Sequence, residues 1–161
     1  SSNLFGNSFF DRQLLDRGID LRFGRGKFSL SQARVIERVH NDFVSTPTHS
    51  TVAAVLKLLS EAGQTEAYCL SQEGNLEGKL SIIHLMGADK DQAVREIMDR
   101  RPLRLKADQN MLEAIEVASG FVGETIPVIE EPGGKMIGVV SESDLFSAYL
   151  DIQEKVQDVE K

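Results

Sequence analysis

The sequence repeats itself, and this repeat limits the possible folds of the chain more than any other feature. Residues 41–85 align without a gap with residues 101–145, at an offset of 60 residues. The identical pairs are Ala54/Ala114, Gly63/Gly123, Thr65/Thr125, Gly74/Gly134, Gly78/Gly138, Ser81/Ser141 and Leu85/Leu145. Several pairs are glycines, which proteins use where the backbone geometry suits few other residues. The repeat therefore predicts two tandem copies of one small unit.

Each copy contains the pattern of an amphipathic helix. Apolar residues recur at helical spacing at Val52, Val55, Leu56 and Leu59 in the first copy and at Met111, Ala114, Ile115 and Ala118 in the second. Ser50 is in position to cap the first helix, and Asn110 with Glu113 has capping-box spacing for the second. Both helices are expected to end near glycines, Gly63 and Gly123.

Two short strands and a second helix follow in each copy. The apolar runs Ala67–Leu70 and Pro127–Ile129 predict strands, and the turns after them predict antiparallel return strands over 76–81 and 136–141. The last helix has an apolar face of Leu145, Tyr149, Ile152 and Val156. The order strand, helix, strand, strand, helix predicts an α/β (α+β) fold of two repeats packed as a pseudo-two-fold pair. The expected boundaries are a linker over 1–29, repeat one over 30–90 and repeat two over 91–161.

Charge is distributed unevenly along the chain. Residues 1–40 hold 7 Lys and Arg against 4 Asp and Glu, or +3. The totals are 18 basic and 25 acidic residues, so the remainder holds 11 against 21, or −10. A body this acidic argues against nucleic-acid binding, which needs a basic face. The basic lead-in has two explanations, a solvated linker or a juxtamembrane segment on the cytoplasmic side, where Lys and Arg accumulate.

The sequence offers little support for catalysis. It has no nucleophile elbow, no P-loop and no dinucleotide-binding glycine motif, and His40, His49 and His84 lack metal-ligand spacing. No stretch approaches the roughly 18 consecutive apolar residues of a membrane-spanning helix. Cys69, the single cysteine, lies in an apolar run and is expected to be buried as a small hydrophobic residue. We therefore expect a protein that is not an enzyme, soluble over the given residues and suited to a reducing compartment.

Both copies resemble the CBS domain, a unit that occurs in pairs. In the second copy the resemblance is carried by Met98-Asp99-Arg100-Arg101-Pro102-Leu103, by Thr125-Ile126-Pro127-Val128-Ile129 and by Gly138-Val139-Val140-Ser141-Glu142-Ser143-Asp144-Leu145. The first copy keeps Gly78-Lys79-Leu80-Ser81, but it has His84 in place of the acidic residue and Ala67 in place of Pro127. The resemblance covers roughly residues 30–155 and implies a regulatory module that forms a homodimer.

Residues 10–21, Phe-Asp-Arg-Gln-Leu-Leu-Asp-Arg-Gly-Ile-Asp-Leu, resemble the stretch that joins the last membrane helix to the CBS pair in bacterial CLC-type chloride channels and transporters. This resemblance implies the cytoplasmic domain of a voltage-gated chloride channel or chloride/proton antiporter. The membrane-embedded domain would then belong to the same chain, and the serine-rich start without methionine suggests a fragment. The alternatives are a CBS pair of an enzyme such as IMP dehydrogenase, one of a magnesium transporter, and a ligand-free dimerisation module.

Ser141 and Asp144 have two explanations. A serine followed three residues later by an acid is the pattern of a capping box. The resemblance to nucleotide-binding CBS pairs implies instead that Asp144 accepts both ribose hydroxyls of ATP, ADP or AMP while Ser141 contacts the sugar or phosphate. A carboxylate suits this role because it offers two acceptors and no donor. The adenine contacts implied in the first copy are Phe43, Val44, Ser45, Gln64, Thr65 and Ala67. The mirror-image site is expected to be weaker, and its residues are His84, Leu103, Arg104, Glu124, Thr125 and Pro127.

Overall fold

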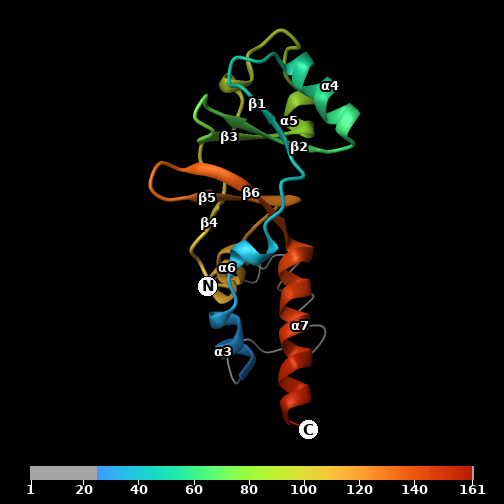
Figure 1. Cartoon of the computed structure of the whole chain (residues 1–161). Coiled ribbons are helices and arrows are strands. Elements are labelled where there is room, and N and C mark those ends of the chain that lie inside the picture. The colour runs from blue at the N-terminus through green and yellow to red at the C-terminus, as the bar shows by residue number, and fades with distance from the viewer. Residues whose placement is uncertain (1–24, 161) are drawn as a thin grey trace. The chain divides into compact units, whose positions relative to one another are not determined.

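The structure, a computed structural model, describes residues 25–160, with side chains over 29–151 (Figure 1). The first element is α3 (Arg25–Gln32), and the 3-10 helices η1 (Val35–Arg38) and η2 (Val94–Glu96) introduce the two repeats. Repeat one contains β1 (Val44–Thr46), α4 (Val52–Ala62), β2 (Glu66–Leu70), β3 (Leu76–Ser81) and α5 (Ile82–Met86). Repeat two contains β4 (Leu105–Lys106), α6 (Met111–Ala118), β5 (Thr125–Glu130), β6 (Lys135–Ser141) and α7 (Glu142–Glu160). The predicted order of elements is confirmed in both repeats.

Each repeat contributes one three-stranded sheet, in the orders β1-β2-β3 and β4-β5-β6. In the first sheet β1 runs parallel to β2, and β2 runs antiparallel to β3 with Tyr68 opposite Lys79. Strands β2 and β5 begin at Glu66 and Thr125, one and two residues earlier than the apolar runs predict. The difference arises because a strand extends into polar residues wherever its backbone still finds hydrogen-bond partners.

The helix ends correct two predictions. Thr51, not Ser50, caps α4, since its hydroxyl accepts the N–H of Ala54. Helix α4 ends at Gly63 with left-handed φ, as expected, but α6 ends at Ala118, five residues before Gly123. The predicted capping box of Asn110 and Glu113 is confirmed. The two N-caps, Thr51 and Asn110, are 59 residues apart. The offset of 60 that relates the β-hairpins of the two repeats is therefore one residue too long at the first helices.

The segment before each first strand is bound to the helix of the other repeat. Val52 N–H donates to the carbonyl of Gln92 at 2.9 Å, and Val94 N–H donates to the carbonyl of Ser50 at 2.8 Å. The lead-in of repeat one makes the equivalent bonds with α6. Met111 N–H donates to the carbonyl of Ala33 at 2.7 Å, and Val35 N–H donates to the carbonyl of Gln109 at 3.1 Å. The two repeats thus exchange their lead-ins reciprocally.

Gly78 shows why a glycine is needed in β3. The segment leading into repeat two pairs with β3 through two backbone bonds of 2.9 Å between Lys79 and Asp99. A Cβ at Gly78 would lie 2.5 Å from Sδ of Met98 and 3.0 Å from the carbonyl oxygen of Asp99. Only glycine admits this close approach of two backbone segments.

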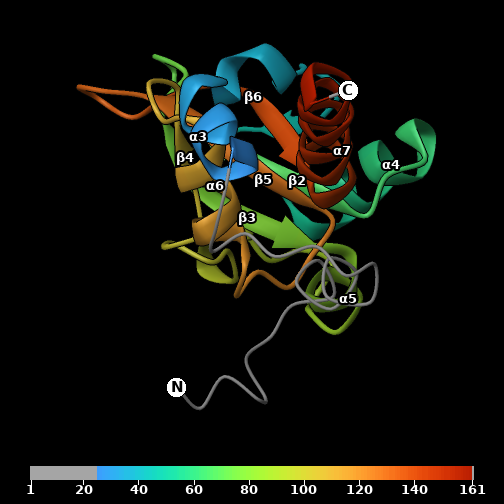
Figure 2. The ribbon, with the colours of Figure 1, turned by 90° about the horizontal axis from the view of Figure 1, so that it is seen from below.

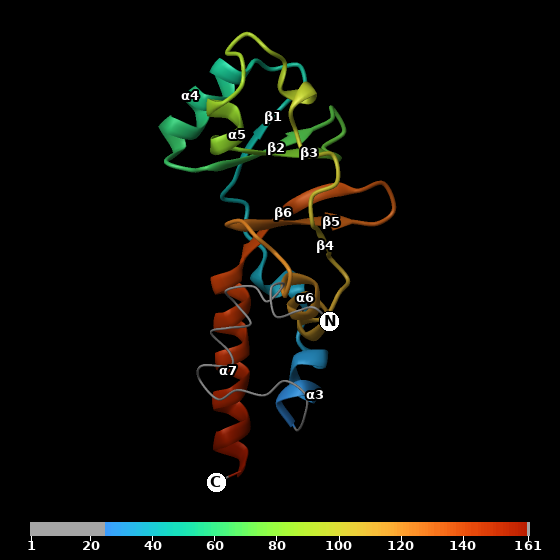
Figure 3. The same cartoon turned by 180° about the vertical axis from the view of Figure 1, so that it is seen from behind.

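The core of repeat one lies between its sheet and the helices α4 and α5, which cover the same face (Figures 1 and 3). Its buried members are Val52, Val55, Leu59, Ala67, Cys69, Leu80, Leu85, Val94 and Met98. Cys69 is confirmed as a buried hydrophobic residue, and burial, with a smaller effect of Glu77, raises the pKa of its thiol to about 11. The opposite face of the sheet carries Tyr68, which packs with Met136 and Val139.

Helices α3, α6 and α7 pack on one another, as the view along α7 shows (Figure 2). Leu30 of α3, Val35 of η1 and Tyr149 of α7 are almost completely buried. An ion pair of 2.9 Å joins Arg38 to Asp151. Leu145 and Tyr149 confirm the first half of the apolar face predicted for the last helix, while the side chains of Ile152 and Val156 are outside the described set.

By its contacts the described chain divides into two compact units that do not follow the repeats. One contains the described residues up to Val39 with 105–126 and those from Val140 onward, and the other contains 40–104 and 127–139. The exchanged lead-ins explain the placing of the described residues up to Val39 and of 91–104, whereas 127–139 join the second unit for a separate reason. The boundaries at 30–90 and 91–161 stay a prediction about the repeat, and residues 1–24 lie outside the described chain.

Candidate functional site

Ser141 and Asp144 form a reciprocal pair at the junction of β6 and α7. Asp144 Oδ2 accepts the backbone N–H of Ser141 at 2.8 Å, and Ser141 Oγ accepts the backbone N–H of Asp144 at 3.0 Å. This is the geometry of a capping box, so the structural explanation of the motif holds. A carboxylate carries four acceptor lone pairs, so one side chain can cap a helix and accept hydrogen bonds from other groups as well. The cap therefore does not prevent the same carboxylate from accepting a sugar hydroxyl.

Ser143 adds a hydroxyl to this junction that the sequence analysis missed. Its Oγ lies 3.0 Å from Ser141 Oγ, and its side chain is exposed. Ser141 and Asp144 are half-buried. The junction thus presents two hydroxyls and a carboxylate within four residues, a set that can both donate to and accept from a polyhydroxylated ligand.

Ser81 and His84 occupy the equivalent junction of β3 and α5. Ser81 Oγ accepts the backbone N–H of His84 at 3.4 Å and lies 3.1 Å from His84 Nδ1. The serine therefore caps both helices, while the residue three positions later is a carboxylate in one repeat and an imidazole in the other. An imidazole has at most one acceptor nitrogen, so it cannot chelate a diol as Asp144 can.

The first-repeat residues predicted to contact adenine divide between the two faces of their sheet. Ala67 lies in the core of repeat one, with Val44, its partner across the strands, packed against that core. Phe43 packs on the other side, edge-on to Tyr68 at 5.9 Å between ring centroids. Ser45 is exposed at the edge strand β1. Because successive strand residues point to opposite faces, these side chains do not form one apolar surface.

Gln64 and Thr65 lie between α4 and β2 and are half-buried. Gln64 Nε2 donates to Asp42 Oδ1 at 3.0 Å, and this bond ties the turn to the residue before Phe43. Asp42 was missed from the sequence; its only signal is its place beside Phe43. The contact units divide the eight predicted residues, because Ser141 and Asp144 belong to one unit and the other six to the second.

Other kinds of site find no support among the described residues. Within 25–160 no group of three or more His, Cys, Asp or Glu side chains could hold a metal ion. No helix in the same range combines the length and the apolar composition that crossing a membrane requires. The mirror-site residues Leu103, Arg104 and Pro127 belong to the unit that contains His84, whereas Glu124 and Thr125 belong to the other.

Comparison with known proteins identifies the repeat. The family model of the CBS domain matches residues 94–151. The solved structure of the CBS-pair protein CBSX2 from Arabidopsis thaliana matches with a TM-score of 0.66 at 19% identity, over 76% of this chain and 97% of that one. Residues 94–151 are a CBS domain, and the chain has the fold of a CBS domain pair. The two strand-helix-strand-strand-helix repeats correspond to the two halves of that fold, and the glycine and capping serine of each mark equivalent positions.

Two of the similar structures hold a nucleotide. CBSX2 in complex with AMP matches this CBS pair with a TM-score of 0.62 at 20% identity, over 75% of this chain and 98% of that one. The cytosolic domain of the Mg²⁺ channel MgtE in complex with ATP matches with a TM-score of 0.67 at 23% identity, over 87% of this chain and 59% of that one. At these identities the likeness concerns the fold.

Among curated proteins, the A-adding tRNA nucleotidyltransferase of Aquifex aeolicus is 30% identical over 123 residues, 71% of this chain and 15% of that protein. The magnesium transporter MgtE of Thermus thermophilus is 27% identical over 125 residues, 74% of this chain and 27% of the transporter. The CBS pair thus spans about a quarter or less of these relatives. One of these relatives is named as an enzyme and the other as a transporter.

Proposed function

We propose that this CBS pair is a regulatory module of a membrane ion-transport protein, that it binds an adenine nucleotide and that it is not itself catalytic. The observation that carries the proposal is the reciprocal pair of Asp144 and Ser141, which holds a carboxylate at the start of α7. Similar folds with ATP and with AMP bound support the ligand class. The magnesium transporter among the relatives supports the class of host.

Asp144 is the proposed ribose acceptor, and Ser141 is the proposed contact to the sugar or phosphate. The carboxylate is already oriented by the capping box, so a ligand need not pay the entropy of ordering it. Phe43, Gln64 and the other first-repeat residues stay a prediction for the adenine. Of these six, Ala67 is the weakest candidate, because its side chain is fully buried in the core of repeat one.

A magnesium transporter is the host that the relatives favour, because MgtE proteins of two bacteria match about three quarters of this chain. The resemblance of residues 10–21 to CLC-type proteins favours a chloride channel or antiporter as the second candidate; those residues lie outside the described chain. Both hosts place the module on the cytoplasmic side of a membrane, joined to a transport domain, and both are compatible with a homodimer.

Regulation requires that the nucleotide distinguish two states of the module. A ligand shifts a conformational equilibrium only by its difference in affinity between the two states. The coupling is reciprocal, so a transported ion that favours one state must change nucleotide affinity by the same factor.

The nucleotide is tested by calorimetric titration of the purified chain with AMP, ADP and ATP up to millimolar concentration. Heat of binding is expected with at least one of them, and Asp144→Asn is expected to weaken it tenfold or more. The asparagine amide oxygen still accepts the Ser141 N–H, so the melting temperature should stay close to that of the wild type. Asp151→Asn, which removes another carboxylate from α7, is the matched control and should leave affinity unchanged. Absence of heat would refute nucleotide binding, and full affinity in Asp144→Asn would refute the site.

The host is tested on the full-length protein in proteoliposomes. Magnesium uptake with no chloride flux is the expected result for the first candidate, and chloride flux with no magnesium uptake is expected for the second. Flux that changes with nucleotide in the wild type but not in Asp144→Asn would support regulation through this residue. A full-length protein that transports neither ion would contradict the proposal of an ion-transport host.

A further inference from the structure

The arginines of the body of the chain are concentrated in the lead-in of repeat two. Residues 41–161 contain four arginines, and all of them lie within 95–104, at Arg95, Arg100, Arg101 and Arg104. We call residues 95–104 the arginine segment. With Glu96 and Asp99 it carries four positive and two negative charges, or +2. Residues 41–161 hold 11 basic and 21 acidic residues, so the rest of this range holds 7 against 19, or −12. The arginine segment is therefore a positive stretch of an acidic body.

The guanidinium groups of the arginine segment are not neutralised. Arg95, Arg100 and Arg101 are exposed, and Arg104 is half-buried. Within the part of the chain that the structure describes, none of the four forms an ion pair with a carboxylate. Asp99 instead uses its Oδ1 to accept the backbone N–H of Arg101 at 3.0 Å. A guanidinium presents its N–H groups in a planar fork that matches phosphate oxygens, so the segment is suited to phosphate groups.

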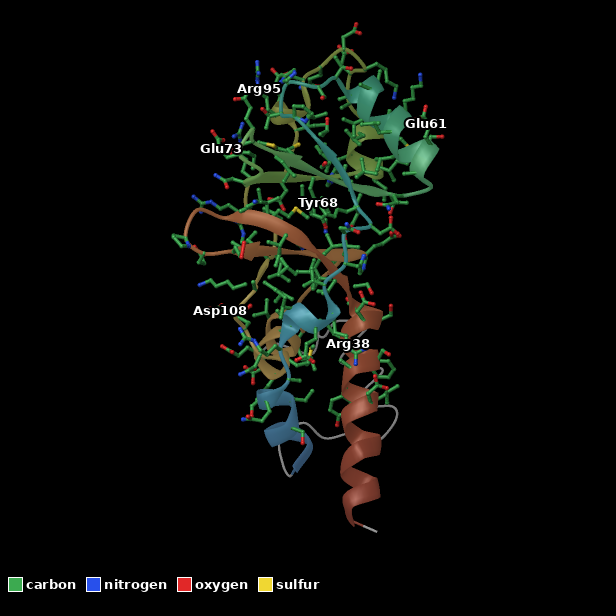
Figure 4. The ribbon with its side chains drawn as sticks, in the orientation of Figure 1. Arg38, Glu61, Tyr68, Glu73, Arg95 and Asp108 are labelled. Atoms are coloured by element: carbon green, nitrogen blue, oxygen red, sulfur yellow. The ribbon has the colours of Figure 1, made fainter. Side chains whose placement is uncertain are left out.

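The backbone of the arginine segment is fixed to repeat one. Two bonds of 2.9 Å join Asp99 to Lys79 of β3, and Arg95 N–H donates to the carbonyl of Thr48 at 3.1 Å. Arg100 Nη2 donates to the carbonyl of Arg95 at 3.0 Å, which brings two of the arginines together. Arg95 itself extends away from the sheet (Figure 4). Because the segment is ordered before a ligand arrives, binding costs less conformational entropy.

An apolar side chain is exposed beside these charges. Residues 101–104 lead directly into β4, and burial alternates along them as in a strand: Arg101 is exposed, Pro102 is buried, and Leu103 is 38% exposed. Alternate residues of an extended chain point to the same side, so Leu103 lies on the side of Arg101. An apolar side chain among arginines suits a surface that is charged at its outer layer and apolar beneath it.

The lead-in of repeat one does not have this chemistry. Asp99 pairs with Lys79 as His40 pairs with Val139, so the offset in the lead-ins is 59 residues. At this offset Arg100 and Arg101 correspond to Asn41 and Asp42. The backbone pairing is thus common to both repeats, whereas the arginines belong to repeat two alone.

We propose that the arginine segment docks on the anionic lipid headgroups of a membrane, with Leu103 at the apolar boundary. The choice of a membrane rests on the proposed host, whose cytoplasmic leaflet is negatively charged and attracts clustered basic residues. Nucleic acid is disfavoured as the partner, because no aromatic side chain is exposed for base stacking among the side chains that the structure describes. Arg100 and Arg101 belong to neither predicted nucleotide site, so this proposal and nucleotide binding can fail separately.

Flotation of the purified chain with lipid vesicles, without nucleotide, measures the docking. Binding is expected to vesicles with about 30% phosphatidylglycerol and not to pure phosphatidylcholine, and about 0.5 M NaCl should release it. Arg100→Gln with Arg101→Gln should lower the partition coefficient about thirtyfold, because each basic side chain near an anionic surface contributes about fivefold. Equal binding to both kinds of vesicle, or to neither, would overturn the proposal.

Two further variants separate the arginine segment from total charge and from loss of structure. Lys57→Gln with Lys135→Gln removes two exposed charges elsewhere and should change the partition coefficient by less than about twofold. Arg100→Lys with Arg101→Lys keeps the charge and should retain most of the binding. A loss in the Lys57 and Lys135 variant as large as that in the Arg100 and Arg101 variant would refute the assignment to this segment.

A tryptophan reporter tests the role of Leu103. The chain has no tryptophan, so Leu103→Trp supplies a single fluorophore. Its emission is expected to shift to the blue when anionic vesicles are added. Val122→Trp is the matched control, since Val122 is 93% exposed and lies outside the segment, and it should show no shift. Vesicle binding without a blue shift at position 103, or with equal shifts at both positions, would contradict this docking face.

Other sources of phosphate are distinguished by competition. Sodium sulfate and ATP at equal ionic strength should release the chain from anionic vesicles to the same extent, because both act by screening. A stronger effect of ATP would assign the arginines to a nucleotide phosphate and overturn lipid docking. Binding of poly(U) RNA as tight as that of the vesicles, and lost in the Arg100 and Arg101 variant, would overturn it in favour of nucleic acid.

Discussion

The two CBS repeats share a backbone and differ in chemistry at equivalent positions. Both have a glycine in the third strand and a serine that caps the helix after it, at Gly78 and Ser81 in repeat one and at Gly138 and Ser141 in repeat two. Where repeat one has the ion pair of Glu66 and Lys79, repeat two has Ile126 and Val139, both fully buried. The comparison shows that backbone constraints define the repeat, while side chains that the backbone does not constrain have diverged.

The divergence also separates possible functions. The carboxylate of Asp144 belongs to repeat two, where it caps α7 and is the proposed ribose acceptor. The exposed apolar side chains of α5 belong to repeat one, with a serine at the equivalent of Ile83. In the proposed function repeat two supplies the ligand-binding carboxylate, whereas repeat one has His84 at the equivalent position.

The largest effect is expected at the ion pair that only repeat one has. Lys79 Nζ lies 3.3 Å from Glu66 Oε2, with side-chain exposures of 12% and 11%, and 5.8 Å from the centroid of the Tyr68 ring. Lys79→Val should lower the free energy of unfolding by about 3 kcal/mol, because a largely buried carboxylate loses the ammonium group that lies 3.3 Å away. The double variant Glu66→Ile with Lys79→Val, which installs the repeat-two residues, should recover most of the loss. Urea unfolding measures both.

Lys90→Val, at an exposed lysine of the same repeat, is the control for loss of charge alone and should change stability by less than about 0.5 kcal/mol. A double variant no more stable than Lys79→Val would show that Ile126 and Val139 are not the functional equivalents of the ion pair.

A smaller difference is expected between the two capping serines. Ser141 Oγ accepts its helix N–H at 3.0 Å, whereas Ser81 Oγ does so at 3.4 Å, close to the limit of a hydrogen bond. Ser141→Ala should therefore cost about 1 kcal/mol and Ser81→Ala less than half of that. Thermal and urea unfolding of both variants measure the difference. Ser60→Ala, at an exposed position inside α4, is the control; equal losses at positions 81 and 141 would mean that the two junctions do not differ in capping.

Much of the fold could be predicted because its signals are local. The box of Asn110 and Glu113 and the strand over 76–81 follow from the spacing of a few residues. The error at Ser50 reflects the offset of 60, which was taken from glycines in the hairpins and is one residue too long at the helix caps. The error at Gly123 has another cause, since α6 has 8 residues and α4 has 11. The exchanged lead-ins could not be predicted, because backbone bonds such as that of Val52 to Gln92 leave no pattern in the side chains.

The candidate site was predicted in the part that depends on spacing. Ser141 and Asp144 are three residues apart, and that spacing is sufficient to place both side chains at one helix end. The position of Ala67 inside the core was not predictable from its apolar character, because an apolar strand residue can face either side of the sheet. Asp42 was missed because its role depends on Gln64, 22 residues away in sequence.

The smallest effect is expected at the lead-ins, the segments that precede the first strand of each repeat. One lead-in is attached by a charged pair and the other by apolar packing. Arg38 pairs with Asp151 at 2.9 Å beside α7 (Figure 4), but the two side chains are 34% and 52% exposed. A double-mutant cycle of Arg38→Ala and Asp151→Ala should therefore give a coupling of about 0.5 kcal/mol or less, and salt should reduce it further. At the offset of 59 the equivalent of Arg38 in the lead-in of repeat two is Ile97, which packs against the core of repeat one, so Ile97→Ala should cost more than either charge removal. A coupling larger than the loss measured for Ile97→Ala would reverse this order and make the ion pair, rather than apolar contact, the stronger attachment of a lead-in.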